Sequence, residues 1–124
     1  MRHDLLSDAL SLINNAERVG KTTCVVPTSS FVKSVLGVVK AAGYMGDIHE
    51  EKGIVTVTLL GKLNKIRVVR PRFSVKKGDF DEWERRYLPS KDTGILIVST
   101  SQGMMTQKDA VSRGLGGKIV AFAY

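Results

Sequence analysis

One stretch of the C-terminal half is the most informative about the fold and the function: Ile95-Leu96-Ile97-Val98-Ser99-Thr100-Ser101-Gln102-Gly103-Met104-Met105-Thr106. The continuous apolar run at its start predicts a buried strand, and Thr106 predicts the N-terminus of a short helix. Three hydroxyl residues and a glycine lie between them. We expect a strand-to-helix loop that brings hydroxyls, backbone N–H groups and a helix N-terminus together. This chemistry suits the oxygens of phosphates and sugars.

The segments next to this loop indicate a small β-rich subdomain with short helices over residues 79–124. On its N-terminal side, Asp79 is placed to cap a helix that presents Phe80, Trp83 and Tyr87 on one face. On its C-terminal side, Thr106 and Asp109 have the spacing of a capping box for a second short helix. A glycine-rich turn at 114–117 then leads into an alternating strand, Lys118 to Tyr124.

A basic segment precedes this subdomain. From Lys62 to Lys77 there are seven Lys and Arg residues and no acidic residue. Pro71 breaks the strand pattern, and residues 71–78 are expected to form an exposed connector between two subdomains. Arg70 and Arg72 straddle Pro71, so both side chains project from a stiffened backbone.

Residues 1–70 predict a second subdomain, of α-β-α-β-β(-β) order, so the chain is assigned to the α+β class. Helical spacing relates Leu6, Ala9, Leu10, Ile13 and Ala16, and again Val32, Val35, Leu36, Val39 and Ala42. Strands are expected at 21–27, 44–50, 54–60 and, as the optional last one, 63–69. Both helices are expected to cover one face of the sheet.

Composition and charge narrow the class of protein. The 124 residues are 43% hydrophobic and 25% charged, which is typical of a globular domain, and the net charge is +7. Residues 63–124 carry 12 Lys and Arg against 6 Asp and Glu, whereas residues 1–62 carry 7 against 6. The pattern favours a polyanionic partner, although basic residues can also serve solubility alone. No membrane span or signal peptide is evident, which favours a cytoplasmic protein with no membrane partner.

Residues suited to contact nucleic acid fall into three groups. The loop contributes Ser99, Thr100, Ser101, Gln102 and Gly103; the basic segments contribute Arg70, Arg72, Arg86, Tyr87 and Lys91; and the start of the second helix contributes Ser29, Ser30 and Lys33. Hydroxyls and backbone can contact phosphate and ribose, and arginine forks can hold phosphates. Each group also has a structural interpretation: local backbone bonding for the loop, a helix N-cap for the serines, and core packing for the aromatic residues.

Catalytic and metal-binding functions are poorly supported by the sequence. His3 and His49 lack the spacing of a catalytic relay, and Cys24 is the only cysteine and is expected to be a buried hydrophobe. No phosphate-binding glycine motif is present. We therefore expect no enzymatic activity, no cofactor and no metal. The alternative of a small-nucleotide phosphate-binding domain built on the 99–103 loop lacks a lysine or a metal-binding acid between Ser99 and Gln107.

Several segments together resemble the eighth small-subunit ribosomal protein. Those in the C-terminal half are Arg86-Tyr87-Leu88-Pro89, the Gly94–Met105 segment and Gly114-Leu115-Gly116-Gly117-Lys118. Those that are similar to the archaeal and eukaryotic branch, and most of all to archaeal members, are Ile13–Gly20, Gly61–Lys65 and Pro71-Arg72-Phe73. The resemblance covers nearly the whole chain. Two departures are Leu5 after Asp4, where the family commonly has proline, and a short turn at Glu51-Lys52-Gly53.

The resemblance implies a structural constituent of the small ribosomal subunit, without enzymatic activity. It implies primary binding to the central domain of small-subunit rRNA, largely through the minor groove of an irregular helix, with Ser99, Thr100, Ser101 and Gly103 as the main contacts. It further implies early binding during subunit assembly, neighbouring small-subunit ribosomal proteins as partners, no DNA partner and a monomeric free protein.

Overall fold

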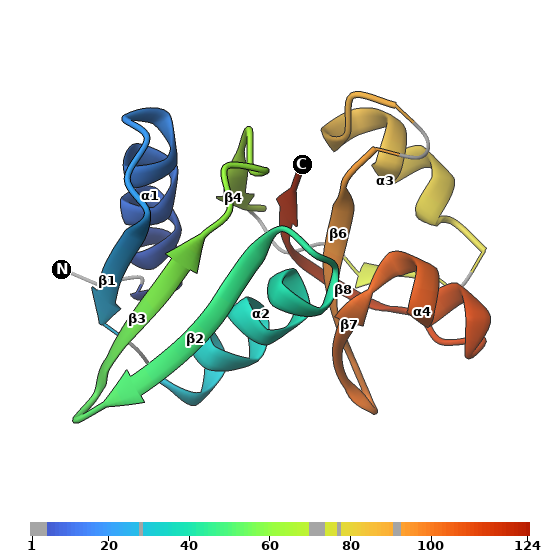
Figure 1. Ribbon diagram of the computed structural model, residues 1–124. Helices are drawn as coiled ribbons and strands as arrows, with labels where there is room; N and C mark the ends of the chain where they lie inside the picture. Colours follow the sequence, from blue (N-terminus) through green and yellow to red (C-terminus); the bar gives the residue numbers. More distant parts are fainter. Residues whose placement is uncertain (1–4, 28, 70–73, 77, 91–92) are drawn as a thin grey trace, which may run out of the picture. The chain divides into compact units, whose positions relative to one another are not determined.

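The computed structural model describes residues 5–27, 29–69, 74–76, 78–90 and 93–124. The chain divides into two compact units, an N-terminal unit, Met1–Arg67, and a C-terminal unit, Val68–Tyr124. Each contains helices and an antiparallel sheet, so the predicted α+β class is confirmed (Figure 1). No helix within the described ranges is long and apolar enough to cross a membrane.

The N-terminal unit is a three-stranded antiparallel sheet with two helices on one face. In chain order its elements are α1 (Leu5–Arg18), β1 (Thr23–Pro27), α2 (Ser30–Ala41), β2 (Met45–Glu51) and β3 (Ile54–Leu59). The strand order is β1-β3-β2. Helix α1 packs on β1, α2 packs on β2, and the two helices contact each other, as the sequence pattern predicts.

Helix α1 forms because its apolar residues follow the helical repeat and its end is closed by a glycine. The residues it buries are the predicted Leu6, Ala9, Leu10, Ile13 and Ala16. Gly20 has φ +80°, and its N–H donates to the Glu17 carbonyl at 3.1 Å, while the Lys21 N–H donates to the Ala16 carbonyl at 3.0 Å. This pair of bonds is the Schellman arrangement, which satisfies carbonyls that the helix leaves open.

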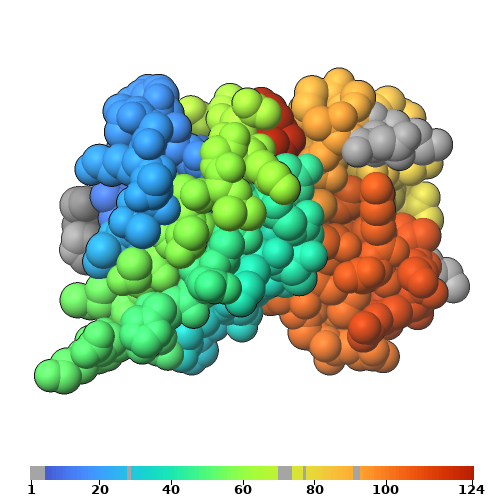
Figure 2. Space-filling model, in the orientation of Figure 1, coloured from blue at the N-terminus to red at the C-terminus, as the bar shows by residue number. Residues whose placement is uncertain are grey.

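The β2–β3 hairpin ends in a two-residue turn. Lys52 and Gly53 have φ values of 51° and 78°, and Glu51 pairs with Ile54 directly before and after them. Two consecutive positive φ values match the twist of a tight hairpin. Figure 2 shows the tip of this hairpin projecting from the rest of the N-terminal unit. Along β3, which forms where a strand is expected at 54–60, every second residue is buried: Val55, Val57 and Leu59.

The C-terminal unit is built on a five-stranded sheet. Its elements are β4 (Ile66–Val68, which straddles the division), β5 (Ser74–Val75), α3 (Phe80–Tyr87), β6 (Ile95–Thr100), β7 (Gly103–Thr106), α4 (Gln107–Ser112) and β8 (Gly117–Ala123). The strand order is β4-β8-β6-β7, and β5 also pairs with β8. The Ile95–Val98 run is fully buried, as predicted for a central strand.

Two sequence expectations differ from the structure. The strand expected at 63–69 is the shorter β4, and it joins the second sheet, where the Val69 N–H donates to the Val120 carbonyl at 2.9 Å. Ser74 and Val75, assigned to the connector, form β5, because Val75 is buried and pairs with Gly117. Alternation identifies a strand but not the strand it pairs with.

The aromatic residues of α3 pack against the C-terminal core. Phe80 is buried, and Trp83, Tyr87, Phe122 and Tyr124 form a stack with ring centroids 6.3, 5.3 and 6.1 Å apart. Parallel offset rings at these distances add favourable contact beyond area burial. Asp79 precedes the helix as predicted, but its side chain forms no capping hydrogen bond.

Candidate nucleic-acid interface

The hydroxyl segment is a β-hairpin, not the strand-to-helix loop that the sequence predicts. Ser99 and Thr100 end β6, Gly103 begins β7, and Ser101-Gln102 form the turn between them. The register pairs Ser99 with Met104 and Thr100 with Gly103. Four residues of strand therefore separate the turn from the start of α4. The helix N-terminus does not contribute to the tip of the hairpin.

Thr100 shapes this turn. Its hydroxyl accepts a hydrogen bond from the Gln102 N–H at 3.1 Å and donates one to the Gly103 carbonyl at 2.9 Å. A threonine bonded in this way fixes a turn through its own side chain. The local structural role that the sequence left open thus applies to Thr100.

The other residues of the hairpin tip face outward. Ser101, Gln102 and Gly103 are exposed, and Ser99 is half-buried. Gly103 has φ +112°, a backbone conformation that a side chain would strain, although a Cβ there would meet no atom within 4 Å. The tip therefore presents hydroxyls, an amide and open backbone to a ligand.

Gly117 supports the hairpin from the neighbouring strand. A Cβ at this position would lie 2.3 Å from the Ser99 carbonyl oxygen and 2.9 Å from Val98 Cγ1. Only glycine permits β8 to approach β6 this closely. The sequence pattern assigned this glycine to a turn, whereas the structure makes it the first residue of β8.

Lys118 is a cation beside the hydroxyls that the sequence interpretation missed. It is the β8 partner of Ser99, and directly opposed residues of antiparallel strands project from the same face. Lys118 is exposed, and among the described residues it forms no ion pair. Its place after the double glycine could have drawn attention to it, but only the strand register shows its neighbour.

A buried amide fixes the base of the hairpin. The Gln107 side chain is 1% exposed; its Oε1 accepts from the Leu96 N–H at 2.7 Å, and its Nε2 donates to Glu84 Oε2 at 3.1 Å. Beside it, the Thr106 hydroxyl accepts from the Asp109 N–H at 3.2 Å, which confirms the predicted cap of α4. These bonds tie β6, α3 and α4 together beneath the exposed tip.

The two remaining described candidates of the C-terminal unit lie on α3. The Arg86 guanidinium carbon sits 4.7 Å from the centroid of the Trp83 ring, a cation–π contact. Tyr87 is half-buried in the aromatic stack, 5.3 Å from Phe122. Arg70, Arg72 and Lys91 lie outside the described residues.

Two of the three candidates of the N-terminal unit already have structural partners. Ser29 caps α2, with its hydroxyl accepting from the Val32 N–H at 3.4 Å, and Ser30 is the first, exposed residue of that helix. Lys33 forms an ion pair with Glu50 at 2.9 Å. The N-cap interpretation is therefore confirmed for Ser29.

Cys24, expected to be a buried hydrophobe, is 8% exposed in β1. Burial raises the pKa of its thiol, and the charge of Lys21 opposes this shift in part. Because the thiolate is disfavoured, this cysteine is a poor nucleophile.

Comparison with known proteins identifies the family. The sequence matches the protein family described as ribosomal protein S8 over residues 4–124. The chain belongs to the ribosomal protein S8 family. This makes it a small-subunit ribosomal protein that binds rRNA and resides among other ribosomal proteins, and the S8 family is structural, not enzymatic.

Proposed function

We propose that this S8 protein is a primary rRNA-binding protein that contacts the central domain of small-subunit rRNA and supports subunit assembly. Family membership supports rRNA binding in general. The resemblance of its sequence segments favours the central domain as the target, an archaeal type of S8 protein and a monomer when free.

The hairpin tip carries the proposal, because it exposes hydroxyl, amide and backbone groups on a base that the Gln107 hydrogen bonds fix. Ser99 and Ser101 can exchange hydrogen bonds with ribose 2′-hydroxyls, which distinguish RNA from DNA. Gln102 and Gly103 add an amide and an open backbone. Lys118, one strand away from Ser99, can pair with a phosphate.

The remaining sequence candidates extend the proposed contact surface. Arg86 on α3, together with Arg70, Arg72 and Lys91, supplies positive charge from the C-terminal half, and Tyr87 supplies an aromatic ring. Ser29, Ser30 and Lys33 supply a smaller contribution, because Ser29 and Lys33 already have partners. The alternative of a small-nucleotide site at residues 99–103 has less support, since the N-terminus of α4 is four residues from the turn.

The test is a triple variant, Ser99→Ala/Thr100→Ala/Ser101→Ala, assayed for binding to the cognate rRNA helix. Loss of hydrogen bonds from Ser99 and Ser101 to ribose and phosphate oxygens, together with loss of the Thr100 bonds that hold the turn, is expected to weaken binding by about 10- to 100-fold. The control Ser11→Ala/Ser112→Ala removes exposed helical hydroxyls elsewhere and should bind as the wild type does. If the triple variant folds and binds with wild-type affinity, the hairpin is not the main contact.

A further inference from the structure

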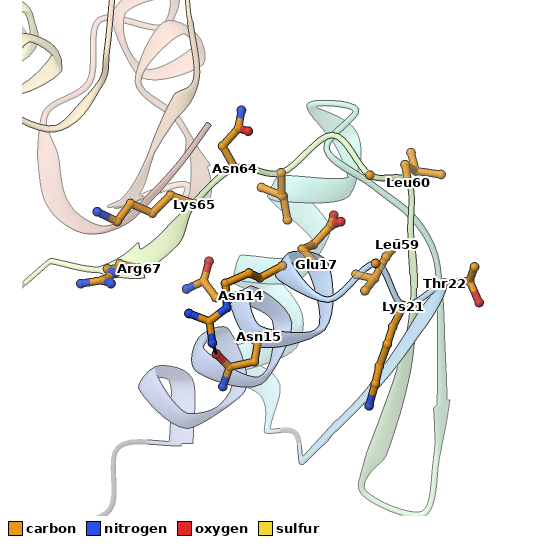
Figure 3. Close-up of a pocket in the computed structure, with 14 residues that line it drawn as sticks. Asn14, Asn15, Glu17, Lys21, Thr22, Leu59, Leu60, Asn64, Lys65 and Arg67 are labelled. Carbon is orange, nitrogen blue, oxygen red and sulfur yellow. Dashed lines mark hydrogen bonds between the residues drawn. The ribbon is translucent and has the colours of Figure 1, made fainter.

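A concave site lies in the N-terminal unit, at the C-terminal end of α1. Its volume is about 650 Å³, and its walls come from α1, from residues 20–22, from the end of β3 and from the segment 60–67 (Figure 3). All of these belong to one compact unit. None of the residues proposed above as rRNA contacts lines it.

Four basic side chains line this pocket: Arg18, Lys21, Lys65 and Arg67. Within the part of the chain that the structure describes, none of them forms an ion pair. Arg18 is held instead by a hydrogen bond from its Nη2 to Asn15 Oδ1 at 3.2 Å. Cations gathered in a concavity concentrate positive potential, which favours an anionic ligand.

Asn14 positions two of these cations. Its Oδ1 accepts from the Ile66 N–H at 2.9 Å, and its Nδ2 donates to the Ile66 carbonyl. Ile66 is fully buried, so its neighbours Lys65 and Arg67 project to the opposite side of the strand and line the pocket. Figure 3 shows these two side chains next to each other.

The pocket also holds an acceptor without a partner. The Oε2 atom of Glu17 is buried and has no hydrogen-bond partner among the residues that the structure describes, and Glu17 lines the same pocket. A buried acceptor left unbonded costs free energy that a donor group of a ligand would restore. Inorganic phosphate supplies mainly acceptors, and its negative charge is repelled by this carboxylate.

We propose that this pocket binds a nucleotide, with its phosphate held by Lys65 and Arg67 and a hydroxyl or amino group donating to the Glu17 carboxylate. Leu59, Leu60 and Leu63 supply apolar wall against which a base can pack. A nucleotide combines all three chemistries, whereas an acidic peptide offers carboxylates without the flat apolar face. The nucleotide is either free or one unit of an RNA strand, and only the second source rests on the proposed function.

The test titrates the full chain with nucleoside 5′-monophosphates, followed by two-dimensional NMR of the backbone amides. Saturable shifts are expected at Gly20, Lys21, Gly61 and Asn64. Lys65→Gln/Arg67→Gln should weaken the binding about tenfold, as two charge-assisted contacts are lost. The control Lys40→Gln/Lys52→Gln removes the same charge from the same unit, outside the pocket, and should leave the binding unchanged.

Glu17→Met tests the donor contact separately from the charge. Wild-type protein should bind the monophosphates more tightly than inorganic phosphate, and this preference should disappear in the variant while phosphate binding itself strengthens. The proposal is overturned if no probe shifts these amides, if inorganic phosphate or a glutamate-rich peptide binds as tightly as the nucleotides, or if Glu17→Met keeps the preference.

Titration with the cognate rRNA helix distinguishes the two sources. Shifts at the pocket amides with this RNA identify a strand nucleotide, whereas shifts with monophosphates alone identify a free nucleotide; both support the pocket. The hairpin triple variant should lose rRNA binding and still show the wild-type amide shifts with monophosphates, because the hairpin residues do not line the pocket. Failure of the hairpin assignment and failure of the pocket assignment are therefore separate results.

Discussion

Two hydroxyl clusters look alike in the sequence and differ in the structure. In the sequence, Ser29-Ser30 and Ser99-Thr100-Ser101 each lie between a segment expected to be a strand and a segment expected to be a helix. At the first, α2 begins at once, and the Ser29 hydroxyl accepts a hydrogen bond from the Val32 N–H. At the second, the chain reverses into β7 and the hydroxyls lie at the tip of a hairpin. The direction of the following backbone therefore decides whether a hydroxyl caps a helix or lies at the tip of a hairpin.

The two clusters also differ in the lysine that lies near each of them. Lys33, one turn into α2, is neutralised by Glu50, whereas Lys118 beside Ser99 has no ionic partner among the described residues. The second cluster also divides its roles internally. Thr100 holds the turn, and Ser101 is left exposed. The hairpin is therefore the better candidate for contact with RNA.

The largest effect is expected from Gly117→Ala, which changes the close packing of β8 against β6 beneath the hairpin. The added Cβ would meet the Ser99 carbonyl oxygen at 2.3 Å, so β6 and β8 must separate. Overpacking against backbone should lower the free energy of unfolding by about 3 kcal/mol, measured by urea denaturation. Gly78→Ala, where a Cβ meets nothing within 4 Å, is the control. Equal stabilities would show that the strands can adjust.

A second variant, Gln107→Leu, removes the buried amide under the hairpin. The Leu96 N–H then loses its acceptor while it stays buried, which should cost about 2 kcal/mol in thermal or urea unfolding. Gln102→Ala changes the exposed glutamine of the same hairpin and should stay within about 0.5 kcal/mol of the wild type. Similar losses in the two variants would contradict a special role for Gln107.

Much of the fold could be predicted because it depends on local periodicity. The buried stripe of α1, the alternation in β3 and the cap at Thr106 all follow from residue spacing along one element. The partner of β4 and the strand at Ser74 could not be predicted, because they depend on pairing with β8, more than forty residues away. Periodicity carries no information about that pairing.

The same limit applies to the candidate site. The sequence identifies the hydroxyls at 99–101 but gives the wrong connection after them, since a four-residue strand is too short to produce a clear alternation. It misses Lys118 and Gly117, because both reach Ser99 only through the strand register. It also cannot show that Lys33 is paired with Glu50 across the N-terminal unit.

A direct comparison of the two clusters uses single serines. Ser29→Ala should lower the free energy of unfolding by about 1 kcal/mol, because the N-cap of α2 is lost. Ser101→Ala should change it by less than about 0.5 kcal/mol, because its side chain is exposed. The order should reverse for rRNA affinity, with Ser101→Ala the weaker binder. If the two variants had the same free energy of unfolding and the same rRNA affinity, the distinction between a capping serine and an RNA-contacting serine would be wrong.

The smallest expected effect is a difference between Lys118 and Lys33 in the salt dependence of rRNA affinity. Each phosphate contact made by a lysine contributes nearly one unit to the slope of log affinity against log salt. Lys118→Gln should reduce this slope by about one unit, because the exposed ammonium beside Ser99 can exchange a bound anion for an RNA phosphate and so release one counterion. Lys33→Gln should reduce it less, since Glu50 already neutralises that charge and competes with a phosphate. The measurement is rRNA binding at several salt concentrations, and a larger change for Lys33→Gln would place the stronger phosphate contact in the N-terminal unit.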